Sequence, residues 1–223
     1  MELLAQFVDI VLHLDKHLAD WISHYGMWVY AILFAIVFAE TGFVVTPFLP
    51  GDSLLFVAGG LATLGTTEAG GGMHIGWLLA TLSVAAILGN TLNYQIGRFF
   101  GPKVFQWEGS RFFNKKALLK TQAFYERHGG KTLVISRFLP IFRTFAPFVA
   151  GIGAMNYPRF IMFNLVGGLS WCFSLTLAGY WFGRLPWVRQ NLSLMIVGIV
   201  LVSLLPLVIV WLMRDKAGEE KKA

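Results

Sequence analysis

Two arginines lie within one strongly apolar stretch, where their side chains could bind an anion. Arg137 and Arg143 are six positions apart, and Pro140 lies between them. On a straight helix they would point about 240° apart at about 100° per residue, but a break at Pro140 would let them converge. Guanidinium groups bind phosphate through paired hydrogen bonds, and helix N-termini add backbone donors. The alternative is structural: each arginine caps carbonyls, neutralises an acid or extends toward lipid headgroups.

Two acids, Glu40 and Asp52, flank a second apolar stretch that contains Pro50. Ionisable groups at membrane depth are costly and usually face a cavity or a partner. A carboxylate in a low dielectric favours its neutral form, so it can take up and release protons. This chemistry suits proton coupling. Two simpler interpretations stay open: Glu40 only pairs with an arginine, and Asp52 beside Ser53 only caps a helix.

Polar residues also interrupt a third apolar segment. Asn90, Asn93 and Gly97 follow one another at three- and four-residue spacing, so they could share one helix face. Amides and glycines in a span most often hold helices together, and we favour that interpretation here. The residues predicted to support the charged site are Ser53, Asn90, Asn93, Tyr94, Thr144, Pro50, Pro140 and Pro147.

The sequence predicts neither a metal site nor a cofactor. Its five histidines are scattered, and its one cysteine, Cys172, lies in an apolar helix with no second cysteine for a disulfide. Lys131 and Arg137 are spaced one residue too closely for the lipid-phosphatase motif, and no proline follows the arginine. The Ser-Gly-His element of that motif is also absent. We therefore expect a protein that is not an enzyme.

Composition places these residues in a membrane. Of the 223 residues, 56% are hydrophobic and 13% are charged, and the mean hydropathy is +0.64. Soluble domains average about 25% charged residues, so we expect one integral membrane domain over residues 1–223. The net charge of +6 comes from basic residues beside apolar spans. There they set orientation and contact anionic lipid, so nucleic acid is not an expected partner. The N-terminus has no secretory signal pattern.

The chain divides into apolar helices and broken apolar stretches. Residues 1–25 carry apolar side chains at helical spacing, which predicts an amphipathic helix on the membrane surface. A crossing needs about 20 residues, and four segments reach that length. The four predicted spans are Met27–Val45, Trp77–Gly97, Phe160–Gly183 and Leu192–Met213.

Two broken stretches, residues 47–65 and 132–155, contain prolines and glycines that interrupt a helix. Each could form two half-helices of roughly 8–10 residues, about 12–15 Å long. Such a pair suits a re-entrant hairpin whose backbone is shielded by protein. Basic residues are dense in loop 98–131 and in tail 214–223, and both should be cytoplasmic. If both stretches are re-entrant hairpins, only the last two predicted spans separate the loop from the tail, so both lie on the cytoplasmic side. Counting the spans in the same way makes the N-terminus cytoplasmic.

Short sequence matches relate the two broken stretches. Phe48-Leu-Pro50 recurs as Phe138-Leu-Pro140, and Val57-Ala-Gly59 recurs as Val149-Ala-Gly151. Each stretch is followed by a span that ends in Gly-x-x-x-Gly, and the predicted hairpins enter from opposite sides. The expected fold is all-α integral membrane: four transmembrane helices plus two re-entrant helical hairpins in an inverted repeat, with an N-terminal amphipathic helix. Small-residue patterns permit a homodimer without requiring one.

Taken together, these motifs resemble the DedA family of bacterial inner-membrane proteins, which is related to the VTT (SNARE-associated) domain of eukaryotic lipid scramblases. The match covers about residues 8–213, nearly the whole chain. Asn90 departs from the family pattern, in which an acidic residue is often found there. The matching motifs are Glu40-Thr-Gly, Phe48-Leu-Pro-Gly-Asp-Ser-Leu-Leu55, Gly89-Asn-x3-Tyr94-x2-Gly97-Arg98, Phe124-Tyr-Glu-Arg-His-Gly129 and Arg137-Phe-x-Pro-x2-Arg143-Thr-x2-Pro147-x3-Gly151.

The resemblance implies a lipid transporter of the bacterial inner membrane. Its substrate would be undecaprenyl phosphate, the carrier lipid of wall synthesis, moved to the cytoplasmic leaflet in dependence on the proton-motive force. It assigns substrate phosphate binding to Arg137 and Arg143, and proton coupling or charge pairing to Glu40 and Asp52. The expected partners are membrane lipid and protons. Other functions stay open: a scramblase or flippase for phospholipids such as phosphatidylethanolamine, a membrane scaffold or chaperone, and a proton-coupled ion or drug exporter.

Overall fold

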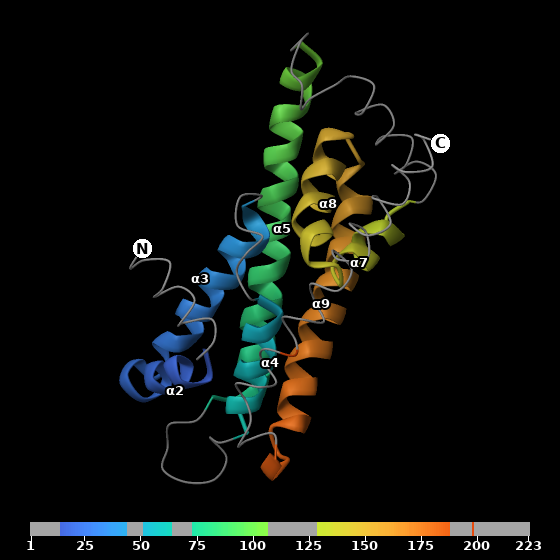
Figure 1. The fold of residues 1–223 in the computed structure, drawn as a ribbon. Helices are drawn as coiled ribbons and strands as arrows, with labels where there is room; N and C mark the ends of the chain where they lie inside the picture. The colour runs from blue at the N-terminus through green and yellow to red at the C-terminus, as the bar shows by residue number, and fades with distance from the viewer. Residues whose placement is uncertain (1–13, 44–50, 64–72, 107–128, 188–197, 199–223) are drawn as a thin grey trace, which may run out of the picture.

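The structure, a computed structural model, describes residues 14–43, 51–63, 73–106, 129–187 and 198 (Figure 1). These residues form helices and the turns next to them, and they include no strand. The all-α class is therefore confirmed for the described part of the chain. In chain order the helices are α2 (Leu14–Tyr25), α3 (Trp28–Gly42), α4 (Gly51–Leu61), α5 (Ile75–Gln106), α7 (Lys131–Ser136), α8 (Pro140–Ile152) and α9 (Tyr157–Phe182).

Two of the described helices are long and apolar enough to cross a membrane. They are Ile75–Gly101, within α5, and Tyr157–Phe182, which is α9. Helix α3 has 15 residues and is only about 22 Å long at 1.5 Å per residue, but its predicted span ends outside the described residues. The fourth predicted span, Leu192–Met213, and the tail 214–223 also lie outside them. The number of crossings therefore stays a prediction.

Helix α5 continues to Gln106, past the predicted end of its span at Gly97. The start of the predicted loop 98–131 is thus corrected to a position after Gln106, and residues 107–128 of that loop lie outside the described part. Gly97 is not a helix stop. A Cβ atom at Gly97 would lie 2.1 Å from the carbonyl oxygen of Phe148, so this glycine lets α8 approach the backbone of α5 closely.

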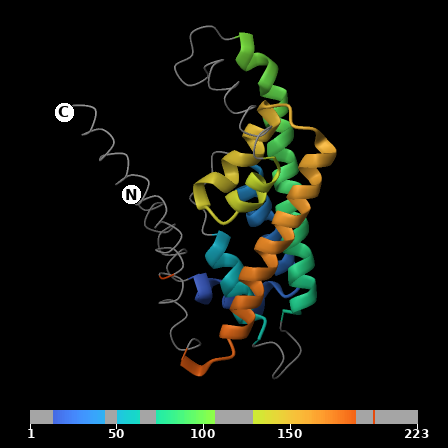
Figure 2. The same ribbon diagram turned by 90° about the vertical axis from the view of Figure 1, so that its right-hand side faces the viewer.

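The short helix α4 lies against the long helix α9 (Figures 1 and 2). A Cβ atom at Gly59 would lie 2.1 Å from the carbonyl oxygen of Thr176. A Cβ atom at Gly179 would lie 1.9 Å from the carbonyl oxygen of Phe56. Any side chain at either glycine would therefore push the two helices apart, and small residues at such crossings are typical of membrane helices.

The other short helix, α8, crosses the other long helix, α5, in the same way. A Cβ atom at Gly151 would lie 2.1 Å from the carbonyl oxygen of Tyr94, and the reciprocal contact of Gly97 is with Phe148. Gly151 and Gly59 end the two matching Val-Ala-Gly sequences. The two matched segments thus make equivalent glycine contacts, each with a long helix from the other half of the chain.

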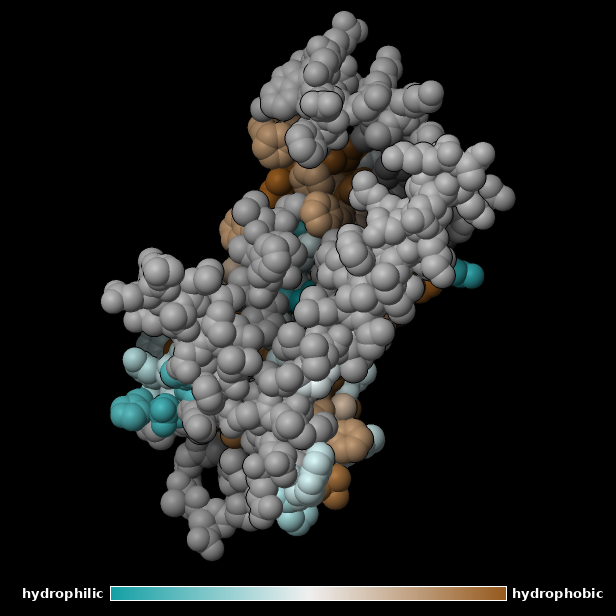
Figure 3. Space-filling view, viewed as in Figure 1, coloured by the Kyte–Doolittle hydropathy of each residue, from teal (hydrophilic) through white to brown (hydrophobic). Residues whose placement is uncertain are grey.

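Helix α2 packs on the same bundle. Leu18 is fully buried in a core that α3, α4, α5 and α9 also supply, and Trp21 and Ile22 pack against it. Hydrophilic side chains gather over this end of the molecule, at the lower left of Figure 3. The described part of the predicted segment 1–25 is therefore an amphipathic helix, and its place at a membrane surface stays a prediction.

Exposed apolar side chains cover much of the described surface. On α9 they recur along the helix at Met162, Val166 and Phe173, and on α8 they include Phe142 and Phe145. The brown patches over α5 and α8 in Figure 3 belong to this surface. Apolar side chains exposed along whole helices are expected of helices that face lipid.

Candidate functional site

Three charged side chains from three helices meet inside the bundle. Arg143 of α8 donates from Nη2 to Oε1 of Glu40 on α3 and from Nη1 to Oδ1 of Asp52 on α4. Both contacts are ion pairs. Glu40 is fully buried, Arg143 is 6% exposed and Asp52 is 18% exposed. The predicted association of the acids with an arginine is thus present in the geometry, and one guanidinium serves both carboxylates.

The N-terminus of α4 receives the Glu40 carboxylate. The backbone amide of Gly51 donates to Oε1 of Glu40 over 3.3 Å, and the positive end of a helix dipole favours a carboxylate there. A Cβ atom at Gly51 would lie 1.9 Å from Oε2 of Glu40, so only glycine leaves room for this carboxylate. Asp52 follows as the second residue of α4 and lies in its first turn.

Trp171 of α9 completes this group, and nothing in the sequence had singled it out. Its Nε1 donates to Oδ1 of Asp52 over 2.9 Å, and the centroid of its ring lies 5.3 Å from Cζ of Arg143. The indole therefore contacts the carboxylate by a hydrogen bond and the guanidinium by a cation–π interaction. We call Glu40, Asp52, Arg143 and Trp171 the acid–arginine cluster.

Arg137 has a different environment. It is 4% exposed, and its Nη2 donates to Oδ1 of Asn164 over 2.5 Å. Among the described residues, no carboxylate lies within ion-pair distance of Arg137. The buried guanidinium of Arg137 is thus bonded to a neutral amide, whereas that of Arg143 is paired with two carboxylates.

Asn164 of α9 is the centre of this second group, and it is also a residue that the sequence reasoning missed. Its Oδ1 accepts from Arg137 and from Nδ2 of Asn90 over 3.3 Å. Its Nδ2 donates to the carbonyl oxygen of Ile87 over 3.0 Å and to Oγ1 of Thr91 over 3.2 Å. We call Arg137, Asn164, Asn90 and Thr91 the amide–arginine cluster.

A break between α7 and α8 positions both arginines. Helix α7 ends at Ser136, and Leu139 has extended backbone angles (φ −115°, ψ 109°) just before Pro140 opens α8. The break predicted near Pro140 is present. Both guanidinium groups then lie along α9. Arg137 packs on Gly167 and Gly168, where a Cβ atom would come within 3.2 Å of its side chain, and Arg143 lies at Trp171, one turn further.

The other predicted supporting residues mostly join helices. Nδ2 of Asn93 donates to the carbonyl oxygens of Thr41 over 3.1 Å and Thr144 over 2.8 Å, which links α5 to both α3 and α8. Tyr94 donates to the carbonyl oxygen of Met155 and stacks on Phe160. Asn90 and Asn93 therefore have different partners.

Most of the remaining predicted supporting residues are buried or lie in α8. Ser53, Thr144 and Pro147 are buried, and Pro147 lies inside α8. Pro140 is the first residue of α8. Pro50 lies outside the described residues.

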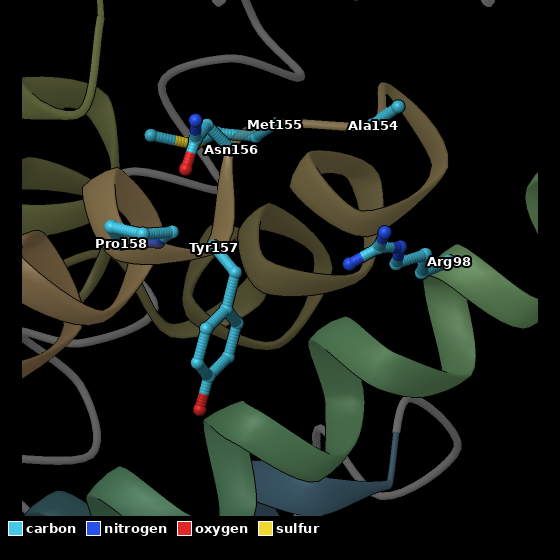
Figure 4. Close-up of a pocket in the computed structure, with 6 residues that line it drawn as sticks. All are labelled: Arg98, Ala154, Met155, Asn156, Tyr157 and Pro158. Atoms are coloured by element: carbon cyan, nitrogen blue, oxygen red, sulfur yellow. The ribbon is translucent and has the colours of Figure 1, made fainter.

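The described residues contain no group of three or more His, Cys, Asp or Glu side chains that could hold a metal ion. Cys172 is a buried free thiol. A cavity of about 340 Å³ lies apart from both clusters, where α8 ends and α9 begins beside Arg98 of α5 (Figure 4). It shares no residue with the clusters and is lined by Arg98, Ala154, Met155, Asn156, Tyr157 and Pro158.

Comparison with known proteins gives consistent matches. The VTT domain family matches residues 49–181. The chain is 52% identical to Protein DedA of Escherichia coli K12, over 98% of each chain. It is 45% identical to an uncharacterized membrane protein of Mycobacterium leprae, over 85% of this chain and 83% of the other. It is 35% identical to Inner membrane protein YqjA of E. coli K12, over 83% and 81%. No solved structure matches.

Proposed function

This chain belongs to the DedA family of VTT-domain membrane proteins, and from that premise we propose that it moves a phosphate-bearing lipid between the leaflets of the bacterial inner membrane. The observation that carries the proposal is a pair of buried arginines at one helix break in an apolar bundle. Guanidinium groups shielded from water bind phosphate strongly and with defined geometry. Undecaprenyl phosphate is the proposed substrate, because its phosphate monoester presents about two negative charges at one end of an apolar chain.

The two acids give the proposed transporter a way to use protons. When phosphate draws Arg143 away, Glu40 and Asp52 lose their cation and each takes up a proton instead. Oε2 of Glu40 and Nε of Arg143 support this exchange, because both are buried and lack a hydrogen-bond partner among the described residues. Substrate and acid thus compete for one arginine, which couples lipid movement to the proton gradient.

The short helices support the proposed re-entrant topology. Helix α4 has 11 residues and α8 has 13, so they reach about 16 and 20 Å at 1.5 Å per residue. The hydrocarbon core of a bilayer is about 30 Å thick. The equivalent glycine contacts of the two short helices support an inverted repeat, in which substrate sites lie at the interface between halves. We propose that both termini are cytoplasmic.

Reconstitution into proteoliposomes tests this function. Labelled undecaprenyl phosphate is placed in one leaflet, and its appearance in the other is followed with and without an imposed pH gradient. The wild type should accelerate the transfer, and Arg137→Gln should slow it by roughly tenfold or more, because a phosphate ligand is lost. Arg184→Gln is the matched control, since Arg184 is exposed and bonds only to Tyr180 in the described structure.

Two results would contradict the proposal. Wild-type protein that moves no phosphate-bearing lipid is no lipid transporter, and flux of ions or drugs without lipid would favour an exporter. Transport by Arg137→Gln at the wild-type rate would remove the phosphate role. Competition by phosphatidylethanolamine in the same assay distinguishes a phospholipid scramblase or flippase from a carrier-lipid transporter. Well-folded charge variants that lose transport argue against a scaffold.

A further inference from the structure

The charges of the two clusters do not balance separately. In the acid–arginine cluster one guanidinium faces two carboxylates, whereas Arg137 faces an amide. A buried charge is normally paired, because leaving water without a counter-charge is costly. Within the described residues the counter-charge of Arg137 is missing. An anionic ligand at this position would supply it.

We propose that Arg137 is the residue that binds the lipid phosphate and that Asn164 is the positioning residue that holds it ready. This assignment rests on the proposed function and deepens it, because it separates the roles of the two arginines. Arg143 is paired with the acids while the site is empty, and it leaves them only when the phosphate, already bound at Arg137, draws it away. The ligand is an alkyl or polyprenyl phosphate headgroup, and its chemistry is shared with free phosphate.

The hydrogen bonds of Asn164 fix which end of its amide faces Arg137. Both of its N–H groups are used, one toward the carbonyl oxygen of Ile87 and one toward Oγ1 of Thr91. Its oxygen therefore points to the guanidinium, and that oxygen also accepts from Asn90. The amide holds Arg137 without neutralising it. A guanidinium has five N–H donors, and Asn164 uses one, so donors remain for a phosphate.

The surroundings of Arg137 suit a lipid. The guanidinium lies close against α9 at Gly167 and Gly168, so a ligand would approach it from the side that faces away from α9. On either side of it in the sequence, Ile135 at the end of α7 and Phe138 in the turn before α8 are 63% and 53% exposed. An apolar chain can lie along these side chains while its phosphate reaches Arg137.

Binding of dodecyl phosphate to purified full-length protein in a non-ionic detergent tests the assignment. Asn164→Asp puts a carboxylate of the same shape against Arg137 and supplies the counter-charge that the ligand would bring. Its affinity for dodecyl phosphate should fall by roughly 30-fold. Asn164→Ala removes the oxygen but adds no charge, so Arg137 loses only its orientation and the affinity should fall by about threefold.

The order of the two variants separates positioning from a merely structural role. Asn164→Ala removes every hydrogen bond of the amide, so a structural role predicts that this variant is the weaker binder. We expect the reverse, with Asn164→Asp weaker. Thermal unfolding and gel filtration confirm that each variant is folded, and Ser174→Ala on the exposed part of α9 is the control.

Other results would overturn the assignment. Wild-type affinity in both variants would show that Asn164 positions nothing, and the proposed lipid transport would stand without it. A wild type that binds no dodecyl phosphate would overturn the phosphate function together with this assignment. Inorganic phosphate is tested as a competitor: weak competition supports a lipid phosphate, and competition equal to that of dodecyl phosphate would identify free phosphate as the ligand.

Discussion

Arg137 and Arg143 lie on either side of one helix break and are buried to nearly the same extent, yet their partners differ. Arg143 bridges Glu40 and Asp52 from two other helices, and Arg137 bonds to the amide of Asn164. The comparison shows that the type and burial of a residue do not decide its role. The partners of the residue matter as well: Arg143 holds three helices together through two carboxylates, and Arg137 has no counter-charge among the described residues.

The largest difference between the clusters should appear in stability. Arg143→Gln leaves two acids without their cation, and Glu40 is fully buried, so we expect a loss of about 3–5 kcal/mol. Arg137→Gln breaks one bond to an amide and removes an unpaired charge, so its stability should change by only about 1 kcal/mol. Thermal unfolding in detergent measures both. Equal losses would erase the distinction between the two arginines.

A smaller effect is expected at Gly51, which leaves room for the Glu40 carboxylate. In Gly51→Ala the new methyl group would lie 1.9 Å from Oε2 of Glu40 and displace it, at a cost of about 1–3 kcal/mol. Unfolding measurements and proton-dependent transport should both register this loss, because the displaced carboxylate is one of the two acids.

Gly42→Ala is the matched control for this variant. It changes a buried glycine in the same helix as Glu40, but its methyl group would find its nearest atoms at 3.5 Å, which is ordinary contact. We expect no loss there, and the lower backbone entropy of alanine should add about 0.5 kcal/mol of stability. If both variants behave alike, the fit of the acid–arginine cluster around Glu40 is looser than the geometry indicates.

A loss smaller than that of Gly51→Ala should come from Trp171→Phe. The phenyl ring keeps a π face near Arg143, but the hydrogen bond from Nε1 to Asp52 is lost, so we expect about 0.5–1.5 kcal/mol. The same change should not alter binding of dodecyl phosphate at Arg137. Tryptophan fluorescence cannot follow this variant at position 171, so unfolding is followed by circular dichroism. A loss of phosphate affinity would show that the two clusters act as one.

The sequence revealed the charged residues because charges are conspicuous in apolar segments. It could not say which acid meets which arginine, since the Arg143–Glu40 pair spans 103 residues of chain. Asn164 was missed because it is a single amide in its apolar span, whereas Asn90 was noticed beside Asn93. Trp171 carried no signal, because tryptophan is common in membrane helices and its partners come from α4 and α8.

The fold was predictable to a similar degree. Helical class and the two long spans follow from hydropathy, and the break before α8 follows from Pro140. The end of α5 could not be predicted from the sequence. Gly97 resembles a glycine that ends a helix, but in the structure it allows a close contact between two helices. Whether a glycine stops a helix or admits a neighbour depends on what packs against it, and sequence order does not give that.

Each short helix packs on the long helix of the other half of the chain, and this has a consequence during translation. Asp52 leaves the ribosome 91 residues before Arg143 and 119 residues before Trp171. At about 5–20 residues per second, the first half therefore waits roughly 5 to 20 s for its cation. During that time α4 has neither its counter-charge nor the helix that covers its glycines. The first half of the chain is thus made before the residues that pair its acid and cover the glycines of α4.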